Sequence, residues 1–292
     1  MNILITGGTG LIGRALCTAL LAENHTLTVL TRRPHKVPSQ CQAIQSLSEW
    51  QPQTNYDAVI NLAGEPIVDK PWTPERKKIL WDSRVTLTQD LVKHMAAAEQ
   101  MPKVFLSGSA IGYYGNSDDT PLDESSPHGA DFSAQLCLEW EKAALEAPTR
   151  VCLLRTGLVL DRTGGFLSKM LLPFKLGLGG YIGSGKQWMS WIHMTDYIAI
   201  VLLLLNNPDA KGAYNMTAPT PVTNLEFTSI LAKTLKRPAV FWTPNRVLQC
   251  LLGERASLLI EGQRVLPAKV NALGYPFVYP DLARACQALL SA

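Results

Sequence analysis

The chain has 292 residues, of which 47% are hydrophobic and 17% are charged. The charged fraction lies below the roughly 25% of average globular proteins, which excludes a disordered chain, a coiled coil or a solvated tail. The 27 basic and 24 acidic residues leave a net charge of +3 and are spread along the chain, so we expect no nucleic-acid-binding surface. The length predicts two lobes or one large α/β unit.

The cysteine pattern and the hydropathy predict the compartment. Six cysteines lie far apart without a C-x-x-C pair, which is typical of buried free thiols in a reducing cytosol. The first basic residue is Arg14, so the start of the chain lacks the charged region of a secretory signal. The longest aliphatic run, Tyr197 to Leu205, is about half of the roughly 20 residues that a membrane span needs. We predict a cytoplasmic protein without a membrane partner, and its oligomeric state stays open.

The first half of the chain alternates short apolar runs with helical patterns, which is typical of βαβ units and a parallel sheet. Strands are predicted at 2–6, 26–31, 58–62, 103–107 and 151–156, with a weak strand near Ala43. Helices are predicted at 11–23, 83–99 and 131–145.

After about residue 160 the pattern changes. Seven glycines occur between Gly164 and Gly185, a helix follows at 195–205, and Asn224 is predicted to cap a helix that runs to Leu235. Turns and a last helix fill the C-terminal 25 or so residues. An element near 195–217 is expected to return to the sheet.

A glycine-rich turn lies directly between the first strand and the first helix. It satisfies G-x-G-x-x-G, in which glycine lets the backbone approach a pyrophosphate and lets the helix pack close to the strand. The free N–H groups and the positive dipole end of the helix then face the phosphates. We predict that a dinucleotide cofactor is bound by Gly7, Thr9, Gly10, Leu11, Ile12 and Gly13. A tight turn without a ligand is the alternative.

The second strand ends in Thr31-Arg32-Arg33, where an NAD-binding chain usually carries an acidic residue. A guanidinium pairs with a 2′-phosphate that a carboxylate would repel. NADP(H) is therefore favoured over NAD(H), with Arg32 as the first candidate and Arg33 as the second. The alternative is that both arginines are ordinary surface charges.

Small residues close the neighbouring strands at the same edge of the sheet. Leu62, Ala63 and Gly64 leave room for the adenosine and ribose, and Ser107 ends the next strand. Arg84, in the helix predicted at 83–99, is assigned to a cofactor phosphate; an exposed helix arginine is the alternative. These residues complete the predicted cofactor site.

Several motifs together resemble the extended short-chain dehydrogenase/reductase superfamily. They are TGGTGLIG at Thr6, NLAG at Asn61, Ser107-Gly108-Ser109, Tyr114-Gly115, Glu124, Arg155, and WIHMTD at Trp191. Four strings resemble, more narrowly, an atypical epimerase-like branch whose reaction is unassigned: NLAGEPI at Asn61, SGSAIGYYG at Ser107, LLPFKLGLGGYIGSGKQWMSWIH at Leu171 and EGQRVLP at Glu261.

The resemblance covers nearly the whole chain and implies an α/β fold. We expect a Rossmann doubly wound parallel sheet with helices on both faces, plus a smaller mixed C-terminal substrate lobe. Residues 1–160 are predicted to form the NAD(P)-binding domain, and residues 161–292 the smaller lobe.

The superfamily uses a Tyr-x-x-x-Lys pair, in which lysine lowers the tyrosine pKa for proton transfer. None of the eight tyrosines has Lys four residues later, and the resemblance places Ser133 and Cys137 at the two positions. Ser109 stands where the resemblance implies a catalytic serine, and Tyr114 follows it closely. These two are the catalytic candidates.

The substrate is predicted to meet polar and aromatic residues of both lobes, because such walls are typical of small-molecule pockets. The alternatives are that the tryptophans pack on the core and that His193 is structural. The candidates are Tyr113, Arg155, Lys186, Gln187, Trp191 and His193.

Two functions remain at this stage. The first is an NADP(H)-dependent oxidoreductase or epimerase that acts on an unidentified small molecule. The second is a catalytically inactive NADP(H)-binding sensor or scaffold. The five histidines include neither H-x-H nor H-E-x-x-H, so no metal site is predicted.

Overall fold

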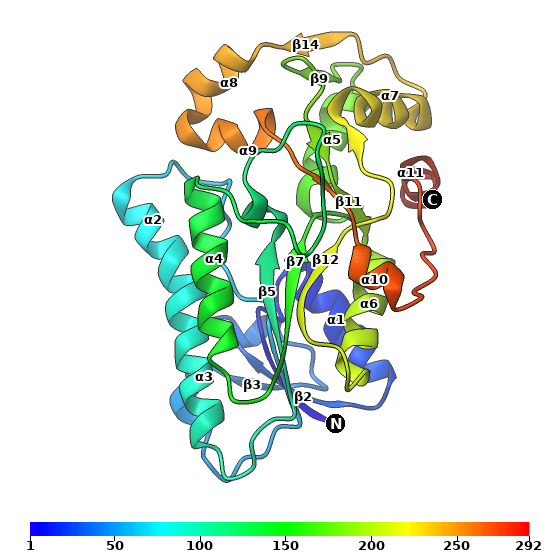
Figure 1. The fold of residues 1–292 in the computed structure, drawn as a ribbon. Coiled ribbons are helices and arrows are strands. Elements are labelled where there is room, and N and C mark those ends of the chain that lie inside the picture. The colour runs from blue at the N-terminus through cyan, green and yellow to red at the C-terminus, as the bar shows by residue number, and fades with distance from the viewer. Residues whose placement is uncertain (292) are drawn as a thin grey trace.

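A computed structural model describes residues 1–291. A parallel sheet of seven strands forms its centre, in the order β12-β7-β5-β4-β1-β2-β3 (Figure 1). Its strands are β1 (Asn2–Thr6), β2 (Thr26–Leu30), β3 (Gln42–Ile44), β4 (Ala58–Asn61), β5 (Val104–Ala110), β7 (Arg150–Thr156) and β12 (Gly212–Met216). The expected Rossmann-type α/β fold is confirmed, and the weak strand near Ala43 is β3.

Helices cover both faces of this sheet, which explains why its strands are apolar without alternation. Ile3 and Ile5 pack in the layer of α1 (Leu11–Ala22) and α6 (Met194–Asn206). Leu4 points to the opposite layer, which is formed by α3 (Leu87–Ala97) and α4 (Phe132–Leu145). In Figure 1 these two layers lie to the right and to the left of the sheet.

Two predicted helix boundaries are wrong. The helix expected at 83–99 begins earlier, with α2 (Pro74–Trp81) capped by Thr73, and reaches α3 through a π-helical turn at Asp82–Thr86. The charged α2 lacks a clear apolar period, so the pattern did not reveal it.

The second correction concerns α7 (Asn224–Leu235). Its N-cap is Thr223 rather than Asn224, because Thr223 and Glu226 form a reciprocal capping box.

The C-terminal part packs α5 (Gly165–Lys175), α7 and α11 (Leu282–Leu290) around a core that contains Phe174, Trp191 and Phe227. Short two-stranded ribbons surround this core: β8 (Leu158–Leu160) with β11 (Trp191–His193), β9 (Gly180–Ile182) with β14 (Phe241–Thr243), β10 (Trp188–Met189) with β13 (Val222–Thr223), and β6 (Pro121–Leu122) with β15 (Arg264–Val265). The remaining helices are α8 (Asn245–Leu252), α9 (Ser257–Ile260) and α10 (Ala268–Ala272). The expected return to the main sheet is made by β12, beside β7; the division at residue 160 stays a prediction.

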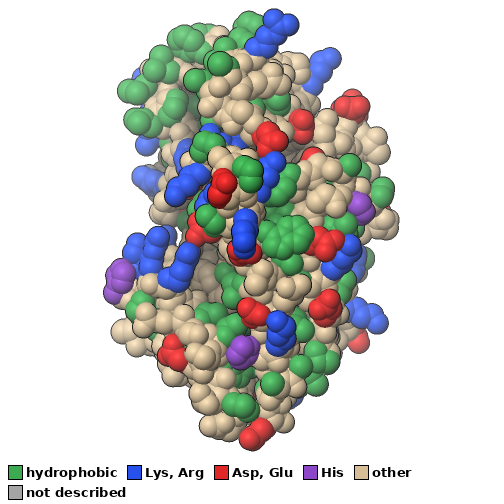
Figure 2. Space-filling view, turned by 90° about the vertical axis from the view of Figure 1, so that its left-hand side faces the viewer, with side chains coloured by type: hydrophobic (Ala, Val, Ile, Leu, Met, Phe, Trp, Pro, Cys, Tyr) green, Lys and Arg blue, Asp and Glu red, His purple; other side chains and the backbone are tan. Residues whose placement is uncertain are grey.

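Charged side chains connect the two parts beyond the carboxyl edge of the sheet. Lys77 pairs with Glu254 at 2.7 Å, and Lys169 pairs with Asp69 at 3.0 Å. Figure 2 shows basic and acidic side chains mixed at mid-height on this side of the molecule. Among the described residues, no helix is both long and apolar enough to cross a membrane.

Candidate functional site

The glycine turn after β1 is shaped by close backbone contacts. Gly7 has φ +72°, and a Cβ there would lie 2.6 Å from the carbonyl carbon of Leu62. A Cβ on Gly13 would collide with the Gly7 carbonyl oxygen, so the first turn of α1 lies directly against the loop. These two positions require glycine for geometric reasons.

The N-terminus of α1 is open to a ligand. Within the described chain no side chain caps this helix at Gly10, and its first turn carries no acidic residue. A Cβ on Gly10 would meet only the Gly7 oxygen, at 3.2 Å, so the space above this residue is free. The first N–H groups of a helix lack internal partners, and here they belong to Leu11, Ile12 and Gly13. The arrangement fits a pyrophosphate at the helix terminus.

A buried hydrogen-bond chain holds the edge beside this turn. Thr6 donates to Asn61 Oδ1 at 2.6 Å, and the Asn61 amide donates to Thr88 at 2.8 Å. The backbone N–H of Ala63 donates to Thr6 at 3.2 Å, which places Leu62–Gly64 directly beside the glycine turn. Ser107 pairs with Asn61 in the sheet and is fully buried. Asn61 and Thr88 are positioning residues that the sequence analysis missed.

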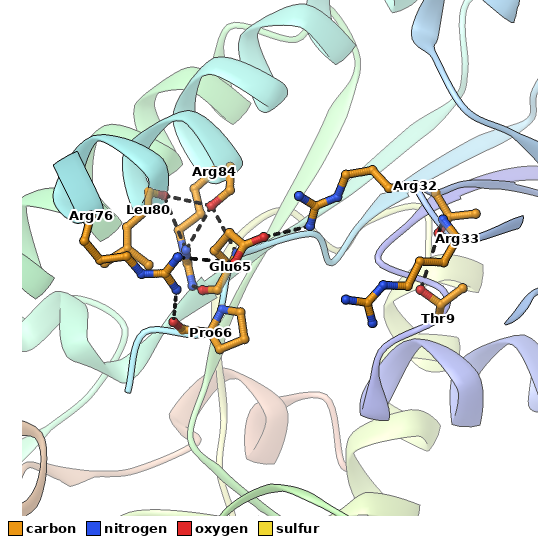
Figure 3. A network of polar contacts seen from close by, with 10 residues as sticks. Thr9, Arg32, Arg33, Glu65, Pro66, Arg76, Leu80 and Arg84 are labelled. Atoms are coloured by element: carbon orange, nitrogen blue, oxygen red, sulfur yellow. Dashed lines mark hydrogen bonds and ion pairs between the residues drawn. The ribbon is translucent and has the colours of Figure 1, made fainter. Parts of the chain in front are cut away.

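Arg32 and Arg33 follow β2 at this edge. Thr31 accepts from the Arg33 N–H at 3.0 Å and lies 3.5 Å from the Thr9 hydroxyl (Figure 3). Arg32 extends toward the loop after β4, where its Nη2 lies 2.7 Å from Glu65 Oε1. The two arginines therefore lie at the strand end where the sequence predicts a 2′-phosphate site.

Arg84 reaches the same loop from the π-helical turn. Its guanidinium donates to the Glu65 carbonyl at 2.9 Å and lies against Gly64. Burial lowers the pKa of Arg84, although nearby charges contribute in both directions. The hydrogen-bond acceptors of this guanidinium among the described residues are neutral oxygens of Glu65, Leu80 and Ser83. A half-buried cation without a carboxylate partner suits an anionic ligand.

A second network of hydrogen bonds, made by buried side chains, lies where β5 and β7 end. Ser109 donates to Glu141 Oε1 at 2.6 Å, and Arg155 holds both oxygens of Glu141 at 2.8 Å. The Tyr114 hydroxyl donates a hydrogen bond to Asn215 Oδ1 at 2.7 Å and accepts one from Arg155 at 2.9 Å. We call these five residues the Glu141 cluster.

The environment of the Glu141 cluster shifts the pKa values of Tyr114 and Arg155. Burial raises the pKa of Tyr114 to about 12, although Arg155 and Asn215 oppose this shift. Burial alone would lower the pKa of Arg155, but the hydrogen bonds and charge of Glu141 raise it above its ordinary value. The Tyr114 hydroxyl is hydrogen-bonded to Asn215 and its pKa is raised, so both features oppose proton transfer near neutral pH, and the catalytic role of Tyr114 stays a prediction.

Arg155 and Tyr113 differ in how far their side chains are exposed to solvent. Arg155 is 4% exposed and its charge is compensated by Glu141, so its predicted contact with substrate stays a prediction. Tyr113 is half-buried, and its ring lies 3.6 Å from the Arg155 guanidinium carbon. Of this pair, Tyr113 is the more exposed residue.

The second-lobe candidates do not meet in one pocket. Lys186 is exposed, and the Gln187 amide donates to the backbone oxygens of Ile182 and Leu259. Trp191 is 0% exposed and donates to the Thr220 carbonyl, which favours the alternative that it packs on the core, and its contact with substrate stays a prediction.

His193 is also structural. Its Nδ1 accepts from the Thr195 N–H and caps α6, and burial lowers its pKa. This capping role favours the structural alternative for His193, and its contact with substrate stays a prediction.

The positions that the resemblance assigns to tyrosine and lysine are buried on α4. Ser133 and Cys137 are both less than one-tenth exposed, and burial raises the pKa of Cys137 to about 12. Neither supplies a phenol or an ammonium group. Among the described residues, no group of three or more His, Cys, Asp or Glu side chains could hold a metal ion.

Comparisons with known proteins show the family to which the chain belongs. Residues 3–217 match the NAD dependent epimerase/dehydratase family, and residues 243–289 match a domain of unknown function, DUF1731. The chain is 41% identical to the chloroplastic epimerase family protein SDR39U1 homolog of Arabidopsis thaliana, over 99% of this chain and 87% of that protein. It is 37% identical to the epimerase family protein SH2119 of Staphylococcus haemolyticus, over 100% of this chain and 99% of that protein.

Solved structures show the same relationship. The human epimerase family protein SDR39U1, crystallised with NADPH, superposes with a TM-score of 0.93 at 37% identity and covers 100% of this chain and 99% of its own. The UDP-glucuronic acid 4-epimerase of Bacillus cereus shares the fold, with a TM-score of 0.81 at 18% identity over 100% of this chain and 98% of its own. The chain belongs to the NAD dependent epimerase/dehydratase family.

Proposed function

We propose that the chain binds NADP(H) in preference to NAD(H) and acts as an oxidoreductase or epimerase on a small molecule. The observation that carries this proposal is the uncapped N-terminus of α1 beside Arg32 and Arg33. The NADPH in the human relative supports the same cofactor. We further propose a cytoplasmic protein whose partner is a small molecule, not nucleic acid or a membrane.

In this proposal, the groups at the carboxyl edge of the sheet have separate roles in binding the cofactor and the substrate. The N–H groups of Leu11, Ile12 and Gly13 hold the pyrophosphate, and Arg32 with Arg33 pairs with the 2′-phosphate. When bound, the nicotinamide donates or accepts hydride. The Ser109 hydroxyl donates a hydrogen bond to Glu141 and keeps its lone pairs, with which it would accept a hydrogen bond from a substrate hydroxyl.

A sensor or scaffold is the second candidate, favoured by the Glu141 cluster. The protons of Ser109 and Tyr114 are both committed within the protein, and α4 carries neither tyrosine nor lysine at the usual positions. Turnover separates the two functions. Carbonyl compounds and nucleotide sugars should be screened with NADPH, and any active substrate should be repeated with Ser109→Ala. A loss of roughly 10²-fold is expected if Ser109 contacts the reacting oxygen, whereas no turnover with any compound favours the sensor.

The cofactor part is tested by titration calorimetry with NADPH and NADH. We expect Arg32→Ala to weaken NADPH binding about 10- to 100-fold and to leave NADH nearly unchanged, because hydrogen bonds to charged groups contribute roughly 1.5–3 kcal/mol. Arg246→Ala, an exposed arginine of α8, is the matched control and should change neither affinity. Equal affinities of the wild type for the two nucleotides would refute the NADP(H) assignment.

A further inference from the structure

The ion pair between Arg32 and Glu65 spans the edge of the sheet that faces the glycine turn. Arg32 follows β2 and Glu65 lies in the loop after β4, while β1, which leads into the glycine turn, lies between these two strands. The Arg32 side chain is 84% exposed, yet its Nη2 lies only 2.7 Å from Glu65 Oε1. Figure 3 shows this side chain stretched toward the loop. Arg32 therefore reaches across the edge to Glu65 while most of its side chain stays exposed to solvent.

Glu65 cannot follow the arginine, because the protein holds it at several points. Its second carboxylate oxygen lies 3.4 Å from Nη1 of Arg76, a side chain that is only 8% exposed. Its backbone N–H donates to Ser83 at 3.1 Å, and its carbonyl accepts from Arg84 at 2.9 Å. Arg76 is itself fixed, since its Nη2 donates to the Pro66 carbonyl at 2.6 Å.

A carboxylate normally repels a nearby phosphate because both are negatively charged, but here neighbouring arginines compensate the charge of Glu65. Arg76 compensates the charge of Glu65 from the protein side, and Arg33 and Arg84 add two further cations nearby (Figure 3). Arg32 uses one nitrogen for Glu65, while a guanidinium carries five N–H donors in a rigid fork. Its remaining edge stays free for a bidentate contact with a phosphate.

Building on the proposed NADP(H) function, we propose that Glu65 is a specificity-determining positioning residue. With Arg76 behind it, Glu65 holds the Arg32 guanidinium in position to contact the 2′-phosphate of NADP(H). An unrestrained arginine loses side-chain rotamer entropy when it binds a phosphate. The ion pair removes part of that loss in advance. The gain is limited to the 2′-phosphate, because NAD(H) carries a hydroxyl at that position.

The test uses adenosine 2′,5′-bisphosphate and 5′-AMP, which differ only in the 2′-phosphate, together with NADPH and NADH. We expect Glu65→Ala to weaken adenosine 2′,5′-bisphosphate and NADPH about two- to fivefold, as the loss of a largely exposed ion pair implies. Glu65→Gln keeps a hydrogen-bond acceptor and should retain part of the affinity. Affinities for 5′-AMP and NADH should stay unchanged. Glu139→Ala, which removes a carboxylate from another exposed ion pair, is the control.

A second arm distinguishes positioning from a general structural effect. In an Arg32→Ala background, Glu65→Ala should have no further effect on NADPH, because Glu65 acts through Arg32. Equal weakening of all four ligands, or tighter NADPH binding in Glu65→Ala, would overturn the inference while leaving the cofactor assignment intact. A wild type that does not distinguish adenosine 2′,5′-bisphosphate from 5′-AMP would instead refute the proposed NADP(H) preference on which the inference rests.

Discussion

Two glutamate–arginine pairs lie at the carboxyl edge of the sheet, and they differ in how far solvent reaches them. Glu65 holds Arg32, which is largely exposed, whereas Glu141 and Arg155 are 6% and 5% exposed. An exposed pair contributes little to stability, and its arginine can contact a ligand at small cost. A buried pair cannot open without leaving a charge unpaired. The exposed pair of Glu65 and Arg32 is therefore suited to ligand binding, whereas the buried pair of Glu141 and Arg155 is suited to stabilising the fold.

The strongest test of this contrast is the stability of the buried pair. Glu141→Ala should lower the free energy of unfolding by about 3–5 kcal/mol, because Arg155 would remain buried without a counter-charge. Urea denaturation followed by circular dichroism measures this loss. Glu139→Ala, on the same helix but paired at the surface with Lys142, should cost less than about 1 kcal/mol. Similar losses in the two variants would contradict the structural role of the Glu141 cluster.

A second test concerns the uncapped N-terminus of α1, at the glycine turn. Gly10 has φ −78° and ψ −179°, a conformation that any residue adopts, so Gly10→Val should fold. Its side chain would fill the free space above the helix terminus and weaken NADPH binding at least about tenfold, because charge-assisted contacts to the pyrophosphate would be lost. Calorimetry gives the affinity and circular dichroism checks the fold. Undiminished binding by a folded variant would remove the pyrophosphate assignment.

The smallest expected effect concerns Tyr114. Tyr114→Phe should cost about 1–2 kcal/mol of stability, because Asn215 loses a buried donor and Arg155 an acceptor. NADPH affinity should change by less than about twofold, because the Tyr114 hydroxyl is hydrogen-bonded within the protein.

The pH dependence of stability gives a further check on the same variant. The folded chain keeps the Tyr114 proton up to about pH 12, whereas the unfolded chain releases it near the ordinary tyrosine pKa of 10. This contribution to stability is therefore present below pH 10 and is lost as the pH rises from about 10 to 12. The stability difference between wild type and Tyr114→Phe should shrink over that range. A constant difference would contradict the buried, protonated phenol.

The sequence by itself determined the strands, the glycine turn and the helix that follows it, because these features depend on residues a few positions apart. Gly7 and Gly13 mark a backbone that only glycine can form, and apolar runs such as the one around Leu4 predict strands buried on both faces. Only the tertiary structure decided which polar side chains stay available to a ligand. Tyr114 and Asn215 are hydrogen-bonded although 101 positions separate them in the sequence, and Ser109 and Glu141 are separated by 32 positions. Likewise, Glu65 can position a ligand-binding side chain only because it pairs with Arg32 and Arg76 in the folded protein. The reason is that burial and charge compensation depend on segments brought together by packing, and no local spacing encodes them.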